Sequence, residues 1–180
     1  PALPCVLHGV SLAVPAGARA IDASGQYVLP GGIDPHVHIG GGTRVDDYRT
    51  ASRAALAGGV TTISNFASPG QGQTLAEAVD REAAVIREQA VADVILHPRV
   101  NDPETQEAQM ATLAETGQTS VKVFMVTAGF DQNVRAYLAT LDAAGDAGIL
   151  TMVHCEDSSI LNYAVAELTA EGKTSLEYFP

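Results

Sequence analysis

A regular alternation of apolar runs and alanine-rich stretches constrains the fold of this chain more than any other feature. The apolar runs, which are rich in β-branched residues, occupy 31–39, 59–67, 91–100, 120–126 and 149–155, and their starts lie about 30 residues apart. Runs of this kind are typical of parallel strands that are buried on both faces. The alternation predicts an α/β protein with five β-α units in series.

Several boundary signals support helices between these runs. Thr74 and Glu77 in "TLAE" form a capping box, Pro103 follows Asp102 in a first-turn pattern, and Asp131 is a further candidate N-cap. Glycines follow the expected helix ends, where a left-handed residue is favoured: Gly58, Gly59, Gly117 and Gly148.

The order of these elements is compatible with an open doubly wound sheet or with a (β/α)8 TIM barrel. The segment "GGTRVDD" after the first run does not match the glycine pattern of a dinucleotide-binding sheet. Histidines instead stand at the C-terminal ends of the runs, where barrels carry functional side chains. We therefore predict the first five units of a barrel over 31–180, because a whole barrel needs about 250 residues. Residues 1–30 contain short β-like pieces and are expected to form part of a small β-sandwich.

Composition narrows the possible partners. The formal net charge is -11 with ten Lys and Arg, and these form no run, so nucleic acid is not expected to bind. No apolar run approaches the roughly 18 residues of a membrane span. Cys5 and Cys155 lie far apart and predict neither a disulfide framework nor a four-cysteine metal site. The chain carries no charged-then-apolar leader and is expected to be cytoplasmic and a piece of a longer protein.

Two histidines in "GGIDPHVHIGGG" are the first candidates for chemistry. His36 and His38 are two residues apart, so in a strand they share a face with Asp34 and can chelate one divalent metal. Their alternative role is that of polar loop residues. His154 ends the fifth run and is either a third ligand or a satisfied core histidine, whereas the neighbouring Cys155 is expected to pack on the opposite face.

Lys122 is the one charged residue in "SVKVFMV". A buried ammonium must lose its charge, form an ion pair or be modified. Three roles remain open: a Schiff-base amine, a structural ion pair, or a carbamate that bridges two cations. His97 and His8 are interpreted as polar packing residues without a chemical role.

Four segments in order resemble the dihydropyrimidinase, hydantoinase and allantoinase group of the amidohydrolase superfamily. They are "YVLPGGIDPHVHI", "AALAGGVTTISNFA", "SVKVFMV" and "MVHCED", and the resemblance extends from Ile21 to Pro180. It implies that His36 and His38 bind one metal, that Lys122 is carbamylated and bridges two metals, usually zinc, and that His154 binds the second. It also implies hydrolysis of a cyclic amide or ureide by a metal-bridging hydroxide, in a homotetramer.

Two departures from that pattern affect the expected site. The remaining histidine ligand and the catalytic aspartate of the family belong to later strands than those present in this chain. Thr127 stands where dihydropyrimidinases and hydantoinases have a tyrosine that stabilises the oxyanion, and losing such a donor costs about 10²–10³ in rate. Allantoinases also lack this tyrosine, so Thr127 is a candidate substrate-binding residue for an allantoin-like ureide. A non-catalytic scaffold and a Schiff-base lyase are the alternatives to the hydrolase.

Overall fold

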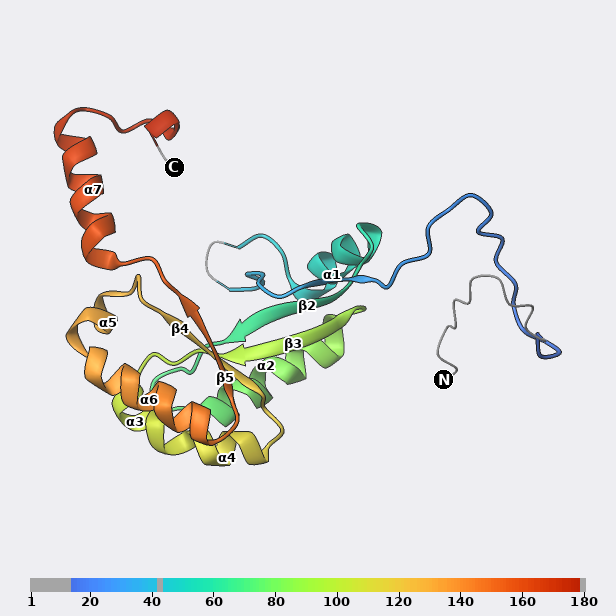
Figure 1. The fold of residues 1–180 in the computed structure, drawn as a ribbon, viewed down its shortest axis with the longest axis horizontal. Helices are drawn as coiled ribbons and strands as arrows, with labels where there is room; N and C mark the ends of the chain where they lie inside the picture. Colours follow the sequence, from blue (N-terminus) through green and yellow to red (C-terminus); the bar gives the residue numbers. More distant parts are fainter. Residues whose placement is uncertain (1–13, 42–43, 179–180) are drawn as a thin grey trace.

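The computed structural model describes residues 14–41 and 44–178, and within them five parallel strands alternate with helices (Figure 1). The strands fall into two sheets, ordered β1-β2-β3 and β4-β5. Their bounds are Gly32–Asp34 for β1, Val60–Ala67 for β2, Asp93–Pro98 for β3, Ser120–Phe124 for β4 and Leu150–His154 for β5. Because every pairing is parallel, the C-terminal ends of the strands lie along one edge.

Helices follow the strands, as the alternation predicted. They are α1 (Tyr48–Ala57), α2 (Leu75–Gln89), α3 (Pro103–Gln106), α4 (Met110–Glu115), α5 (Ala128–Gln132), α6 (Val134–Asp146) and α7 (Ser158–Ala170), with short 3₁₀ turns at Glu107–Gln109 and Leu176–Tyr178.

Most of the predicted helix boundaries are confirmed. Gly58 follows α1 but is not left-handed, with φ -88°, and Asp102 precedes α3 without a side-chain capping hydrogen bond. The capping box between Thr74 and Glu77 forms, and Pro103 occupies the first turn of α3. Gly59, Gly117 and Gly148 adopt positive φ values of 81°, 87° and 73°. The N-cap predicted at Asp131 is wrong. Asp131 lies inside α5, which begins after Thr127, and its carboxylate accepts a hydrogen bond from the Ser158 hydroxyl instead of capping a helix.

Three hydrophobic clusters hold the helices against the strands. One of them, Ala67, Ala78 and Leu96, packs α2 against β2 and β3, and two others involve more residues. The larger one joins β4 to α2, α4 and α6, and its fully buried members include Leu75, Leu113, Val121 and Val123. The smaller one, around Tyr48 and Ile63, packs α1 against β2. Residues 120–123 of β4 are all buried, as expected for a strand covered on both faces.

The junction between β3 and β4, which we call the seam, is joined by few backbone hydrogen bonds. An isolated parallel bridge pairs Arg99 with Lys122, and the Val100 amide donates to the Lys122 carbonyl at 2.8 Å. Side chains supply the remaining connections across the seam. His97 Nδ1 lies 2.7 Å from Ser120 Oγ, and Gln118 Nε2 donates to the Leu96 carbonyl at 2.6 Å.

Residues 14–31 extend away from the sheets without forming a strand (Figure 1). The β-like pieces predicted at 18–22 and 26–30 are therefore not strands here, because a strand requires a neighbour to accept its hydrogen bonds. Tyr27 and Leu29 are 95% and 77% exposed. The pieces in 1–13, with Cys5 and His8, lie outside the described residues, and the division at residue 30 stays a prediction. No helix among the described residues is both long and apolar enough to cross a membrane.

Candidate metal centre

His36 and His38 follow β1 rather than lying within it, which corrects the expectation of a strand that carries both. The strand stops at Asp34, since Pro35 has no amide hydrogen and the Asp34 carboxylate accepts the His36 amide at 3.1 Å. The two ring nitrogens Nε2 nevertheless lie 3.2 Å apart. Two nitrogens bound to one tetrahedral zinc at about 2.0–2.1 Å are about 3.3–3.4 Å apart. The pair therefore fits a single shared cation.

The backbone after His38 is clamped by a buried side chain of β2. Asn65, 3% exposed, accepts the Ile39 amide at 3.3 Å and donates to the Ile39 carbonyl at 3.1 Å. Its amide also donates to the Tyr48 hydroxyl at 2.7 Å, and this hydroxyl donates to Glu82 at 2.7 Å. The chain that carries the histidines is thus fixed to β2, α1 and α2 by one polar network.

Lys122 is buried in β4, with only 3% of its surface exposed. Its Nζ lies 4.8 Å from the centre of the Phe124 ring and 5.5 Å from that of Phe66. Among the described residues no carboxylate forms an ion pair with it. Burial lowers the pKa of Lys122, with a smaller opposing effect from Cys155. A structural ion pair within this part of the chain is therefore excluded.

His154 is the last residue of β5 and stands beside Phe124, with ring centres 5.6 Å apart. Its Nε2 lies 3.2 Å from the Glu156 carboxylate. Cys155, which was expected to pack, has an exposed thiol instead, because the strand has already ended and the strict alternation of faces ends with it.

Two phenylalanines that the sequence did not single out lie at the centre of this arrangement. Phe66 has ring-centre distances of 4.8 Å to His36 and 5.2 Å to His38. Phe124 lies 5.5 Å from Phe66 and next to Lys122 and His154. All four predicted ligands therefore surround one aromatic pair. Within the described ranges, however, no three His, Cys, Asp or Glu side chains converge at metal-binding distance.

His97 also belongs to this region, beyond the packing role expected of it. It is buried, its ring centre is 6.0 Å from that of Phe66, and Nδ1 pairs with Ser120. Its Nε2 is buried without a hydrogen-bond partner in the described structure. Burial, and then the charges of Lys122 and His36, lower the pKa of His97. Its position near the end of "VILHPRV" was the signal that could have identified it.

The electrostatic environment keeps the paired histidines neutral. Burial lowers the pKa of both His36 and His38, and the next contribution comes from Lys122 for His36 and from Arg44 for His38. Neutral imidazole is the form that binds metal ions. Two close imidazoles, beside a buried lysine that forms no ion pair within residues 14–41 and 44–178, fit a cation site.

Thr127 lies at the N-terminus of α5, where its hydroxyl donates to the Phe124 carbonyl at 2.9 Å. A hydroxyl has one proton to donate, and this one is directed to the backbone. The structure therefore does not present Thr127 as a free donor to a substrate.

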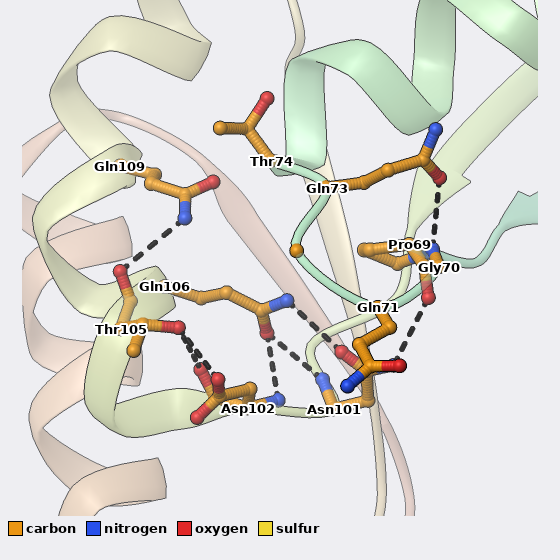
Figure 2. Close-up of a pocket in the computed structure, with 11 residues that line it drawn as sticks. Pro69, Gly70, Gln71, Gln73, Thr74, Asn101, Asp102, Thr105, Gln106 and Gln109 are labelled. Carbon is orange, nitrogen blue, oxygen red and sulfur yellow. Dashed lines mark hydrogen bonds between the residues drawn. The ribbon is translucent and has the colours of Figure 1, made fainter.

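A separate polar hollow lies between the loops that follow β2 and β3 (Figure 2). Its volume is about 470 Å³, and none of the predicted ligands lines it. The glutamine side chains that line it already form hydrogen bonds to the backbone. Gln106 Oε1 accepts the backbone amides of Asn101 and Asp102 at 2.9 Å each. Gln109 Oε1 accepts the backbone amide of Leu75 at 2.8 Å. These contacts stabilise the two loops.

Comparison with known proteins now identifies the class. Residues 27–179 match the model of the amidohydrolase family, so the chain belongs to this family, whose solved members have TIM-barrel folds. Among its relatives are the D-hydantoinase of Rhizobium radiobacter, 38% identical over 170 residues, which cover 91% of this chain and 37% of the relative, and the dihydropyrimidinase of Rattus norvegicus, 34% identical, with 89% and 32% covered.

A crystal structure of a D-hydantoinase superposes with a TM-score of 0.75 at 34% identity, and covers 90% of this chain and 37% of that protein. The resemblance seen in the sequence motifs is thereby confirmed. The chain spans about a third of the length of the relatives that it matches, with 37% and 32% for the two named above.

Proposed function

We propose that the protein is a metal-dependent cyclic amidohydrolase that opens a ring C–N bond in a hydantoin-, dihydropyrimidine- or allantoin-like substrate. Relatives named D-hydantoinase and dihydropyrimidinase support this reaction class. The observation that carries the proposal is the 3.2 Å separation of His36 Nε2 and His38 Nε2 near Lys122, which is buried and forms no ion pair in the described part of the chain.

Each residue has a distinct role in the proposed centre. His36 and His38 would hold one divalent cation, His154 would hold a second, and Lys122, as a carbamate, would contribute to both. Such cations, zinc by preference, would supply Lewis acidity toward the ring carbonyl and the attacking water. By analogy with the family, the assembly is proposed to be a homotetramer.

Modification of Lys122 follows from its environment. A neutral amine adds to carbon dioxide through its lone pair, which forms the C–N bond and releases one proton. Burial favours the neutral amine, since it lowers the pKa of Lys122. The product carries one negative charge, so a neutral amine next to the histidines would become an anionic group that can bind cations.

The test uses the full-length protein purified without chelators. We expect about two divalent ions per subunit and hydrolysis of hydantoin or dihydrouracil. A chelator should abolish this activity, and added zinc should restore it. Fewer than one ion per subunit, with activity indifferent to chelators, would refute the metal mechanism. Bound metal without hydrolysis of any cyclic amide would favour the scaffold alternative, and borohydride trapping of a carbonyl compound on Lys122 would favour the lyase.

A further inference from the structure

Three cationic side chains near the candidate metal centre form no ion pair among the described residues. The chain as a whole has a net charge of -11, yet Lys122, Arg44 and Arg99 cluster near His38. In the part of the chain that the structure describes, ion pairs join only His154 to Glu156 and Lys173 to Glu171. Both arginines thus lack a carboxylate partner among these residues.

Arg99 is held rigidly at the end of β3. Its amide donates to the Ala67 carbonyl at 2.8 Å, and its backbone bridges to Lys122. The guanidinium carbon lies 5.1 Å from the centre of the Phe124 ring, and Nε is buried without a hydrogen-bond acceptor in the described structure. A buried N–H of a cation that lacks an acceptor is unfavourable, and an incoming anion would satisfy it.

Arg44 approaches the same place from the loop after His38. One of its N–H groups donates to the Gly40 carbonyl at 3.0 Å, so the other donors of the guanidinium stay available. Its charge is close enough to lower the pKa of His38. The two arginines are therefore contributed by separate loops at the same edge of the strands.

A small cavity separates the two arginines. Its volume is about 60 Å³, and Arg44, Arg99, His38, Ser68, Phe66 and Phe124 are among its lining residues. A water needs about 10–15 Å³ measured in this way, so the cavity admits a group of a few heavy atoms and excludes a ring. His38 forms one wall, so a group in the cavity is adjacent to the proposed cations.

We infer that this cavity binds a carboxylate carried by a short side arm of the substrate, between Arg99 and Arg44, while the ring lies against the metal centre. Arginine matches a planar carboxylate with paired hydrogen bonds. The inference rests on the proposed function and narrows it to cyclic amides or ureides that bear an acidic substituent.

The test compares two substrates of nearly equal shape, a hydantoin with a carboxymethyl group at ring carbon 5 and the same ring with a carboxamidomethyl group. For the full-length protein we expect kcat/KM to favour the acid about 10- to 100-fold, the range of one or two charge-assisted hydrogen bonds. In Arg99→Gln and Arg44→Gln this ratio should fall toward one. Arg53→Gln, which removes an exposed charge on α1, should leave it unchanged.

Binding of the same two compounds to the metal-free protein, measured by calorimetry, separates this inference from the reaction. Tighter binding of the acid that Arg99→Gln abolishes supports the subsite even if neither compound is hydrolysed, in which case only the proposed function fails. Equal binding of acid and amide, or an equal loss of both in Arg99→Gln, overturns the subsite and indicates that Arg99 pairs with a carboxylate elsewhere in the protein.

Discussion

The side-chain amide of Asn65 makes both hydrogen bonds that a β-strand neighbour would make to Ile39, at 3.3 Å to its amide and 3.1 Å to its carbonyl. A side chain therefore continues the pairing between β1 and β2 past the point where the strand itself has ended. The metal-binding imidazoles proposed here precede that clamp by one residue and three residues.

Removing the clamp should loosen the histidines. We expect Asn65→Ala to reduce bound metal at the His36–His38 site by at least about tenfold in affinity and to destabilise the protein by about 1–3 kcal/mol, because the Ile39 groups lose their partners. Metal content against free zinc, together with the thermal midpoint, measures both effects. Leu113→Ala, in the largest core cluster, should cost about 2–5 kcal/mol and leave metal affinity unchanged; parallel loss in both variants would contradict a specific clamp.

Replacing Lys122 with Met should separate its chemistry from its packing. Met keeps the apolar volume against Phe66 and Phe124 but cannot add carbon dioxide. We expect at least about a 10³-fold loss of kcat/KM, as for other groups essential to metal activation of water. We expect no loss of stability in the metal-free protein, because Met replaces a buried amine that forms no ion pair among the described residues.

Isotope labelling checks the modification directly. Protein equilibrated with ¹³C-bicarbonate should show a carbamate carbon resonance that is absent from Lys122→Met. In Lys122→Ala, short carboxylic acids should restore part of the activity by occupying the vacated space. Full activity in either variant, or an unchanged resonance in Lys122→Met, would exclude the bridging role.

Thr127 is expected to contribute little to oxyanion stabilisation, since its proton is directed to the Phe124 carbonyl. Thr127→Val should therefore lower kcat by less than about fivefold, against the 10²–10³ expected for a true oxyanion donor. Steady-state kinetics on dihydrouracil distinguishes the two cases. Thr127→Ser, which keeps the hydroxyl, serves as the matched control.

The Tyr48 phenol should make the stability of the protein depend on pH only in the alkaline range. Burial, and then the hydrogen bond to Glu82, raise the pKa of Tyr48 well above its usual value of about 10. Its folded pKa exceeds its unfolded pKa, so the stabilising contribution is complete below about pH 10 and decreases as the pH rises above it. Between about pH 9 and 11, unfolding by urea should become easier more steeply in the native protein than in Tyr48→Phe. Identical slopes would show that folding does not raise the pKa of this phenol.

The sequence predicted the order of the strands and the apolar runs that carry the candidate residues. It did not predict where β1 ends. The candidate ligands could be selected because histidine and lysine are unusual within or at the end of an apolar run. They are His36, His38, Lys122 and His154. β1 stops at Asp34 because the Asp34 carboxylate accepts the His36 amide and Pro35 has no amide hydrogen to donate to a neighbouring strand. The periodicity of apolar residues does not reveal such local hydrogen bonds.

The sequence contains no signal for three residues that surround the candidate centre. Residue types such as those of Phe66, Phe124 and Asn65 are common in strands, and their spacing does not distinguish them from core residues. They become part of the site only because β2 and β4 bring them next to His38 and Lys122. Arg99 was overlooked for the same reason, since its importance depends on a cavity formed by four separate segments.

The seam between β3 and β4 would allow substitutions to change the geometry of the proposed centre. Contacts of His97 with Ser120 and of Gln118 with Leu96 contribute to the spacing of the two sheets there, beside a single backbone bridge. Lys122 lies on one side of that junction and the paired imidazoles on the other. Substitutions at 97, 118 or 120 would therefore shift Lys122 relative to His36 and His38 without breaking a β-ladder. In the proposed centre, residues that never touch the ion would then adjust the selectivity between cations of different radius.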